Sequence, residues 1–477
     1  MNSHDLSAPT LSYRRAITTF VVVSLALLMA SIDMSIVAVS LPHIMRDLNT
    51  SLAWTSWIMT GAQLSQCIMM PIIGKLSDDW GRKRLFLIAA IIFTLSSLAA
   101  GFAPNIYVLI IFRVLQGLSG GAFLPSATGI ISDAFGERRA TYIGLFASIF
   151  PIGGIIGPNL GGFLVDSLSW RWTFYINVPI GILLIILGYI IFPKGKISAT
   201  RRGIDFKGAG LFAGAIIAIL YAVTHWANNP QSSGLITWIL LSAGIVLLFL
   251  FYRHENRAVN PMIDLQLLRW RPFFAANLYN FVYGAVVFGI FAFIPYYSAL
   301  YYDMTAAQTG LVLTPRSIAM VVMAALCSFL LIKFRYRLPM ITGTVLSAAS
   351  LFILGQGFKN MTLAGQVLPD MVLMMMIMAL GGIGMGIANP AANNAILDLV
   401  PDKVASVTGM RGMFRISGGI LGTAGVVLTL SFYQDKALGL QHIAIFYGVM
   451  LLLLIPLIYL IPDNARNKSR KGLMTAE

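Results

Sequence analysis

The sequence predicts an all-α membrane protein, and three observations lead to this prediction. Hydrophobic residues make up 58% of the 477-residue chain and charged residues only 11%, whereas a soluble domain usually carries about a quarter charged residues. Apolar stretches of about 20 residues, the length that a spanning helix needs, follow one another. They are continuous, as in 21–30 and 181–192, unlike the alternating segments of membrane β-barrels. Helices are therefore expected to satisfy the backbone hydrogen bonds inside the bilayer.

Fourteen stretches are long enough to span, and they group as six, two and six. The expected spans are 17–41, 52–73, 85–103, 106–126, 141–166, 173–193, 207–226, 235–252, 273–299, 306–332, 339–358, 368–397, 404–432 and 442–462. The first span contains Asp33, which favours a retained span over a cleavable signal peptide. We therefore expect an N-terminal six-span bundle over 1–195, two linker spans over 196–265 and a C-terminal six-span bundle over 266–477.

The basic residues predict the orientation. Loops on one side of the predicted membrane hold 25 Lys and Arg residues, and loops on the other side hold four. Cytoplasmic loops carry this excess, so both termini are expected in the cytoplasm. The net charge of +15 is thereby explained by topology, with the lipid bilayer as partner and without nucleic acid.

One carboxylate, Asp33, lies deep within a predicted span. A charged side chain there is costly and is by default a functional candidate. Its expected partner is Arg113 in the fourth span, because Asp166 and Asp398 lie near span ends. Burial favours the neutral acid and a nearby guanidinium favours the carboxylate. The pair is therefore either a proton- or cation-coupling site or a structural lock between two helices.

A glycine-rich segment at 153–162 occupies the fifth span. Gly153, Gly157 and Gly161 recur every four residues, and Gly162 follows directly, a pattern that lets helices approach closely. Pro158 interrupts the hydrogen-bond ladder, so a bend is expected. The alternative interpretation is an ordinary packing face.

The turn at 74–84 between the second and third spans combines glycines with opposite charges. Gly74, Asp78, Gly81, Arg82 and Lys83 predict a tight turn whose carboxylate meets a helix N-terminus or an arginine. We call this set the cytoplasmic latch. The alternative is that its basic residues only follow the orientation rule.

Polar residues in the second half are candidates for lining a cavity. Asn277, Asn280 and Tyr283 share one face of the ninth span, and Arg415 lies one turn after Arg411 in the thirteenth. Interhelical hydrogen bonding is the alternative for the first three. Snorkelling toward the headgroups is the alternative for Arg411 and is harder for Arg415.

No motif of a soluble or membrane enzyme is present. The sequence has no Walker motif, zinc pattern or nucleophile elbow, and Cys67 and Cys327 lie in separate apolar segments. A channel would require a filter-like ring or loop. We therefore expect neither an enzyme nor a channel, and no metal or other cofactor.

Taken together, these segments resemble the major facilitator superfamily, and within it the fourteen-span drug:proton antiporters. The matching segments are 33–42, 74–84, 113–121 with the further cavity candidate Gln116, 153–162, 170–181 and 415–424. The resemblance implies two six-helix bundles plus two additional central helices. It covers nearly the whole chain and is most specific across the first six spans.

The resemblance also implies a function. It implies proton-gradient-driven export of amphipathic drugs or antiseptic compounds across the cytoplasmic membrane by alternating access. Asp33 would be the proton- and cation-sensing carboxylate and Arg113 its coupling partner. Gly157 and Pro158 would belong to the bend that controls gating, and the latch would stabilise the outward-facing state. A functional monomer is expected, and an accessory export protein is left open.

The sequence departs from this family pattern in its second half. Many of these exporters carry further acidic residues deep in later spans, whereas this chain has Arg316, Arg411 and Arg415 there instead. This difference weakens the case for dicationic substrates and leaves monovalent cations, neutral or zwitterionic compounds, and anionic amphiphiles. An exporter or flippase of an endogenous lipid, glycolipid or other amphiphilic metabolite is therefore the alternative function.

Overall fold

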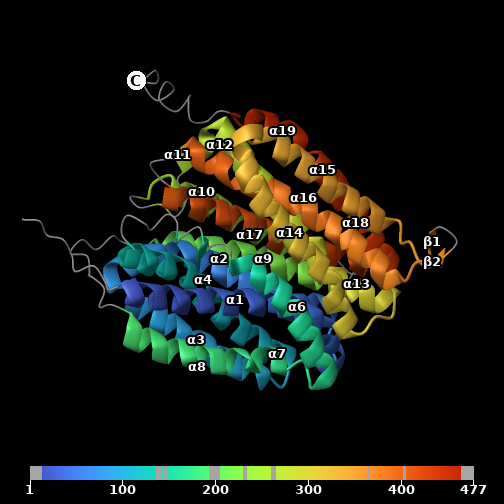
Figure 1. Cartoon of the computed structure of the whole chain (residues 1–477), viewed down its shortest axis with the longest axis horizontal. Helices are drawn as coiled ribbons and strands as arrows, with labels where there is room; N and C mark the ends of the chain where they lie inside the picture. The colour runs from blue at the N-terminus through green and yellow to red at the C-terminus, as the bar shows by residue number, and fades with distance from the viewer. Residues whose placement is uncertain are drawn as a thin grey trace, which may run out of the picture.

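The structure is a computed structural model, and within its described residues the chain is almost entirely helical. The described residues are 13–135, 142, 145–146, 149–192, 205–228, 234–258, 261, 265–363, 366–400 and 404–463. Figure 1 shows two bundles of roughly parallel and antiparallel helices lying side by side, blue to green for the first half and yellow to red for the second. The predicted all-α membrane fold is confirmed.

The first bundle contains the helices of the first six expected spans. They are α1 (Tyr13–Asp47), α2 (Leu52–Trp80), α3 (Arg82–Gly101), α4 (Ile106–Phe135), α6 (Ile149–Ser167), α7 (Trp172–Tyr175) and α8 (Asn177–Ile191). Helix α2 packs on α4, α1 on α6, and α3 on both α4 and α8. On α8 the buried residues are Asn177, Gly181, Leu184 and Gly188. Their spacing of three and four places one helix face on the bundle, and large apolar side chains such as Ile186 point outward.

The second bundle contains the helices of the last six expected spans. They are α11 (Leu265–Arg269), α12 (Arg271–Gly284), α13 (Ile294–Tyr301), α14 (Ala306–Phe334), α15 (Arg337–Gly355), α16 (Asp370–Leu399), α17 (Val404–Ser431), α18 (Lys436–Leu452) and α19 (Ile455–Leu460). Between α15 and α16 a short antiparallel hairpin, β1 (Thr362–Leu363) with β2 (Gln366–Val367), pairs Thr362 with Val367. The sequence did not predict this hairpin.

Three expected spans are interrupted, two of them close to a proline and one where another helix approaches closely. Helix α7 ends at Tyr175 and α18 at Leu452, each four residues before a proline that has no N–H for the ladder. In the ninth span a π-helical turn (Ala285–Gly289) and a 3₁₀ turn (Ile290–Phe293) separate α12 from α13. There Gly422 of α17 lies directly against the Ala285 backbone.

Two helices, α9 (Phe206–Asn228) and α10 (Leu235–Glu255), form the middle pair. They pack on each other, and α9 also contacts α2 of the first bundle and α17 of the second. The Trp57 indole N–H donates to the Thr224 hydroxyl over 2.7 Å. The middle pair therefore contacts both bundles through α9. The domain boundaries after 195 and 265 stay predictions, because residues 193–204 and 262–264 lie outside the described part.

Within the described residues, twelve helical segments are long and apolar enough to cross a membrane. Two further long helices, α2 and α6, belong to the same bundle as four of them. The arrangement is thus compatible with the fourteen spans that the sequence predicts.

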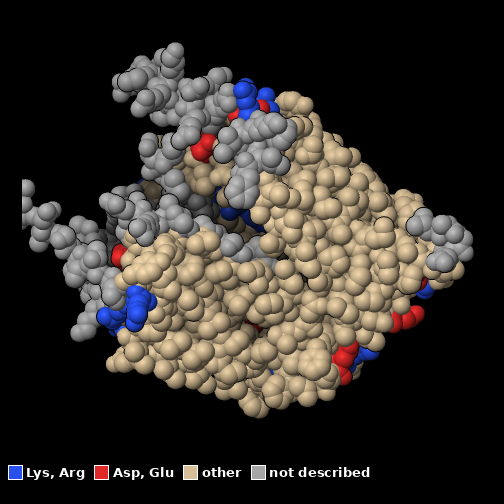
Figure 2. Space-filling view, viewed as in Figure 1, with Lys and Arg blue, Asp and Glu red and all other residues tan. Residues whose placement is uncertain are grey.

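The two bundles meet at one end of the molecule. The Asp166 carboxylate, at the end of α6, accepts a hydrogen bond of 2.8 Å from the Ala307 N–H in the first turn of α14. Near it, the backbone of Gly162 packs against that of Ala306. Figure 2 shows a hollow between the bundles at the opposite end, where α1 begins, with arginine or lysine atoms visible inside it.

Candidate functional site

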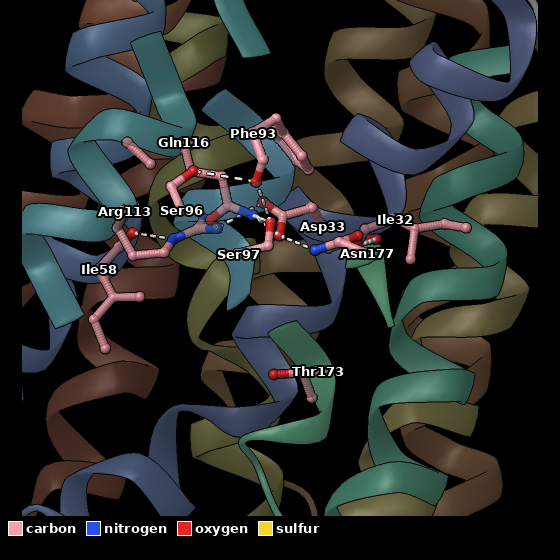
Figure 3. A network of polar contacts seen from close by, with 12 residues as sticks. Ile32, Asp33, Ile58, Phe93, Ser96, Ser97, Arg113, Gln116, Thr173 and Asn177 are labelled. Carbon is pink, nitrogen blue, oxygen red and sulfur yellow. Dashed lines mark hydrogen bonds and ion pairs between the residues drawn. The ribbon is translucent and has the colours of Figure 1, made fainter. Parts of the chain in front are cut away.

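Asp33 lies in the middle of α1 and is almost completely buried, with 4% of its surface exposed. Its carboxylate accepts three hydrogen bonds from side chains of two other elements. Arg113 donates to one oxygen over 2.6 Å, and Gln116 and Asn177 donate to the other over 2.8 Å each. Figure 3 shows these donors converging on the carboxylate from α4 and α8. Three side-chain donors thus meet at one buried carboxylate.

Gln116 links this network to its surroundings. Its amide oxygen accepts a second Arg113 N–H at 2.6 Å, and its amide nitrogen also donates to the Ser97 hydroxyl of α3 over 2.8 Å. Four helices, α1, α3, α4 and α8, therefore meet at one charge pair. The Asn177 amide oxygen is buried and has no hydrogen-bond partner. Among the described residues it is the one amide oxygen of this network that can still accept a hydrogen bond.

Arg113 is held by more than the carboxylate. It is 2% exposed, its Nε donates to the Ile58 carbonyl over 3.0 Å, and its guanidinium lies 5.7 Å from the centre of the Phe174 ring. A buried ion pair stabilises a fold only when its hydrogen bonds are satisfied, and loss of one partner costs about 3–5 kcal/mol. This network is therefore sensitive to any change in the charge of Asp33.

A pocket borders the ion pair. It is lined by Asp33, the amides Gln63 and Gln66, and apolar side chains that include Met34 and Met59. Flexible methionine side chains adapt to ligands of different shape. A buried carboxylate that borders a pocket of polar amides and methionines is a candidate functional site.

The glycine-rich segment of α6 packs between the two bundles. A Cβ at Gly157 would come within 2.0 Å of the Ser35 hydroxyl, and one at Gly161 within 2.7 Å of Ile36, both on α1. Gly153 faces α1 in the same way, at Ser31. The sequence predicted this close approach, and only glycine allows it.

The opposite face of α6 contacts α14 of the second bundle. Ser317 donates to the Gly154 carbonyl over 2.9 Å, and Asn159 donates to the Thr314 hydroxyl over 2.6 Å. The Pro158 carbonyl is so close to Gly310 that a Cβ there would lie 2.3 Å from it. Helix α6 thus connects α1, which carries Asp33, to the second bundle.

The cytoplasmic latch is described in part. Gly81 joins α2 to α3 with a φ of 91°, a conformation that favours glycine. Arg82 forms a 2.6 Å ion pair with Asp133 at the end of α4, and Lys83 donates to the Phe192 carbonyl over 2.9 Å. These contacts lie within the first bundle. The side chains at positions 74 and 78 of the latch lie outside the described set.

The second-half candidates occupy two different environments. Asn277 and Asn280 are buried and donate to carbonyls of their own helix, Phe273 and Ala276. Tyr283 and Arg415 instead lie together, with the guanidinium 5.5 Å from the ring centre. Only the latter two are thus brought together by the fold.

Two residues of the Asp33 network were not among the predicted site residues. Asn177 and Ser97 are buried, and each is a small polar residue within an apolar span. The sequence offered one signal for Asn177, because this residue lies in the segment 170–181, which is one of those that carry the family resemblance. Ser97 carries no signal in the sequence, because serine is common in spanning helices.

Comparison with known proteins agrees with this architecture. The model of the Major Facilitator Superfamily matches residues 23–301 and 276–476. Among curated proteins, the chain is 30% identical to Multidrug transporter protein MdtP of Bacillus subtilis, over 83% of this chain and 72% of that protein. It is 33% identical to Multidrug resistance protein 3 of the same species, over 89% and 82%. It is also 27% identical to the Tetracenomycin C resistance and export protein of Streptomyces glaucescens, over 85% and 74%.

Solved structures show the same fold at low identity. The inward open conformation of the xylose transporter XylE from E. coli superposes with a TM-score of 0.61 at 15% identity, over 94% of this chain and 97% of that one. A D-xylose-proton symporter superposes with a TM-score of 0.64, also at 15% identity, over 95% and 99%. Family model, curated relatives and fold agree over most of the length, and the chain therefore belongs to the major facilitator superfamily.

Proposed function

We propose that this membrane transporter is a proton-coupled antiporter that exports amphipathic compounds across the cytoplasmic membrane. The observation that carries the proposal is the buried Asp33 carboxylate, held by Arg113, Gln116 and Asn177 beside a pocket. The names of its relatives, which include multidrug transport and resistance, support the class of cargo. The excess of basic residues in one set of loops supports cytoplasmic termini.

The coupling would follow from the charge of Asp33. In the ionised state the carboxylate accepts all three donors, and protonation removes the charge that holds Arg113. Loss of this ion pair would change the relative stability of the different arrangements of the helices that share the network. A proton that enters from outside would favour one arrangement of the bundles, and its release inside would favour the other.

Alternating access is supported by the contacts between the bundles. They meet where α6 ends and α14 begins, and the hollow lies at the other end. Rocking of one bundle against the other would move the opening across the membrane. Helix α6 contacts α1 and α14 at once, and it is therefore the element through which the state of Asp33 would reach the second bundle. We propose that one copy of the chain is sufficient for this cycle.

The test is proton efflux from acid-loaded inside-out vesicles on addition of lipophilic cations, neutral dyes or anionic amphiphiles. Wild type is expected to release protons with at least one class, and well-folded Asp33→Asn is expected to release none. Asp47→Asn is the control, because Asp47 forms a surface ion pair with Arg171. Proton release by Asp33→Asn at the wild-type rate would contradict the proposal.

Arg113 would be left unpaired in Asp33→Asn, and this alone could prevent folding. The double variant Asp33→Asn/Arg113→Gln removes both charges together and is expected to insert. A double variant that folds and still couples protons would show that the pair is only a structural lock between helices.

Export or flipping of an endogenous amphiphile, such as a lipid, is the second candidate. The observation that favours it is the group of arginines inside the second bundle, at 316, 411 and 415. A lipid-transfer assay in proteoliposomes would separate this function from drug export.

A further inference from the structure

Three arginines lie inside spanning helices of the second bundle. Arg316 is on α14, and Arg411 and Arg415 are one turn apart on α17. Each side chain is only partly exposed, although each lies within a predicted span. Arg316 has a buried Nη1, and Arg411 and Arg415 each have a buried Nε, without a hydrogen-bond partner.

These charges lack the compensation that Arg113 has. Among the described residues, no carboxylate lies within ion-pair distance of any of the three. Within the described residues, the three guanidinium groups make one hydrogen bond, from Arg415 to the Asn389 amide oxygen over 2.9 Å. A buried unpaired charge is strongly unfavourable, so these guanidinium groups are suited to an anion that arrives from elsewhere.

Arg316 and Arg415 approach one region from two helices. Arg415 lies 5.5 Å from the Tyr283 ring centre and 5.6 Å from that of Phe288. Arg316 lies 5.2 Å from the ring centre of Phe291, one helical turn beyond Phe288. The result is a cationic centre with aromatic rings around it. Both positions lie close to the first bundle, because Ser317 donates to the Gly154 carbonyl and Ser417 lies 3.8 Å from the Cys67 sulfur.

We propose that Arg316 and Arg415 form a binding subsite for the anionic headgroup of an amphiphilic substrate, with Phe288 contacting its apolar part. Guanidinium groups bind phosphate and carboxylate oxygens through paired hydrogen bonds. The Phe288 ring, which is partly exposed, provides apolar surface for a chain. Asn389 orients Arg415 from α16. This inference rests on the proposed export function and narrows its cargo to amphiphilic anions.

The subsite has a consequence for coupling. The proton site at Asp33 lies in the first bundle and the anion subsite in the second, so proton and cargo occupy different places. An anion would not compete with a proton for one carboxylate, as a cationic drug would. Coupling would therefore run through the helix contacts between the bundles, such as that from Ser317 to Gly154.

The test is equilibrium binding of radiolabelled dodecyl phosphate to the full chain in phosphatidylcholine nanodiscs, with empty discs as background. Wild type is expected to bind saturably, with competition by dodecanoate and none by dodecyltrimethylammonium. Arg316→Gln and Arg415→Gln are each expected to weaken binding by about tenfold or more, the size of one charge-assisted hydrogen bond. Arg253→Gln, at the exposed cytoplasmic end of α10, is the matched control and should bind as wild type does.

Two further arms make the result decisive. Arg316→Lys and Arg415→Lys keep the charge, so they guard against misfolding and should bind more tightly than the Gln variants. Inorganic phosphate should not displace radiolabelled dodecyl phosphate at the concentration where unlabelled dodecyl phosphate does. Displacement at that concentration would contradict the proposed contact between the protein and the apolar chain. Phosphatidylglycerol in the discs should lower dodecyl phosphate binding only if a membrane lipid is the natural occupant. If phosphatidylglycerol still lowers dodecyl phosphate binding in both Gln variants, the lipid binds elsewhere, and this result would contradict the assignment.

Unchanged affinity in both Gln variants, or stronger binding of the dodecyl cation, would overturn the inference. The binding and proton-release experiments distinguish failure of the subsite from failure of the proposed antiport. Dodecyl phosphate binding without proton release would leave the subsite in place and remove the proposed antiport. Proton release with cations, without dodecyl phosphate binding, would support the antiport and overturn the subsite.

Discussion

At the residue scale, the Asp33–Arg113 ion pair is held by four helices. The fold places the two charged groups 2.6 Å apart, and Asn177 and Ser97 join the network because α8 and α3 pack beside α1 and α4. The rule that intramembrane charges pair was sufficient to predict the ion pair from the sequence. The places of Asn177 and Ser97 could not be predicted, because they depend on the packing of the whole bundle.

Asn177 tests whether its hydrogen bond positions the Asp33 carboxylate for transport. Its amide donates to Asp33 over 2.8 Å, so Asn177→Leu removes one of the three side-chain donors and leaves the ion pair with Arg113 in place. The rate of substrate-driven proton release is expected to fall by about tenfold, the equivalent of one hydrogen bond to a charged group.

The measurement is the transport rate in vesicles, with the substrate and the gradient held constant. Asn256→Leu is the control, because Asn256 is exposed and donates to the Tyr252 carbonyl of its own helix end. A wild-type rate for well-folded Asn177→Leu would show that this hydrogen bond is not needed for transport.

At the element scale, apolar length located the helices well and gave no information about their interruptions. The expected span 306–332 became α14 (Ala306–Phe334), and 235–252 became α10 (Leu235–Glu255). The π-helical turn at Ala285–Gly289 could not be predicted, because it arises where Gly422 approaches from a helix far along the chain. The β1–β2 hairpin involves two residues a strand, too few for a periodic signal.

The contact between α1 and α6 gives a prediction at this scale. Gly157→Ala would place a Cβ 2.0 Å from the Ser35 hydroxyl and 3.0 Å from the Ile32 carbonyl. The helices must separate or Ser35 must rotate, which is expected to cost about 1–3 kcal/mol of stability. The thermal unfolding midpoint in dodecyl maltoside should fall, and the transport rate should fall with it.

Gly210→Ala on α9 is the matched control, because a Cβ there meets no atom within 4 Å. It is expected to leave the midpoint unchanged or raise it, since alanine favours a helix over glycine by about 1 kcal/mol. Equal behaviour of the two variants would mean that close approach of α6 to α1 is not needed.

At the scale of the whole molecule, the two bundles share an architecture and differ in charge. The first compensates its buried arginine with a carboxylate, whereas the described part of the second has arginines with unpartnered nitrogens. The sequence predicted both halves from the spacing of the spans. Which surfaces meet between them could not be predicted, because glycine-rich and small-residue faces occur on several helices.

Those surfaces give the final prediction. The Asp166 carboxylate lies 2.8 Å from the Ala307 N–H, at the end of the molecule where the bundles touch. Cross-linking Asp166→Cys/Ala307→Cys with a short bis-methanethiosulfonate reagent, which joins the two thiols through reducible disulfide bonds, should hold this end closed, because alternating access requires the bundles to separate there. Transport should stop on cross-linking and return after reductive cleavage, while the two native cysteines, which are buried, stay unreacted. Asp47→Cys/Arg171→Cys joins two positions of the first bundle whose side chains form an exposed ion pair of 2.6 Å, and its cross-link should leave transport intact. Full cross-linking of the first pair with undiminished transport would show that the two bundles do not part at this contact during the cycle.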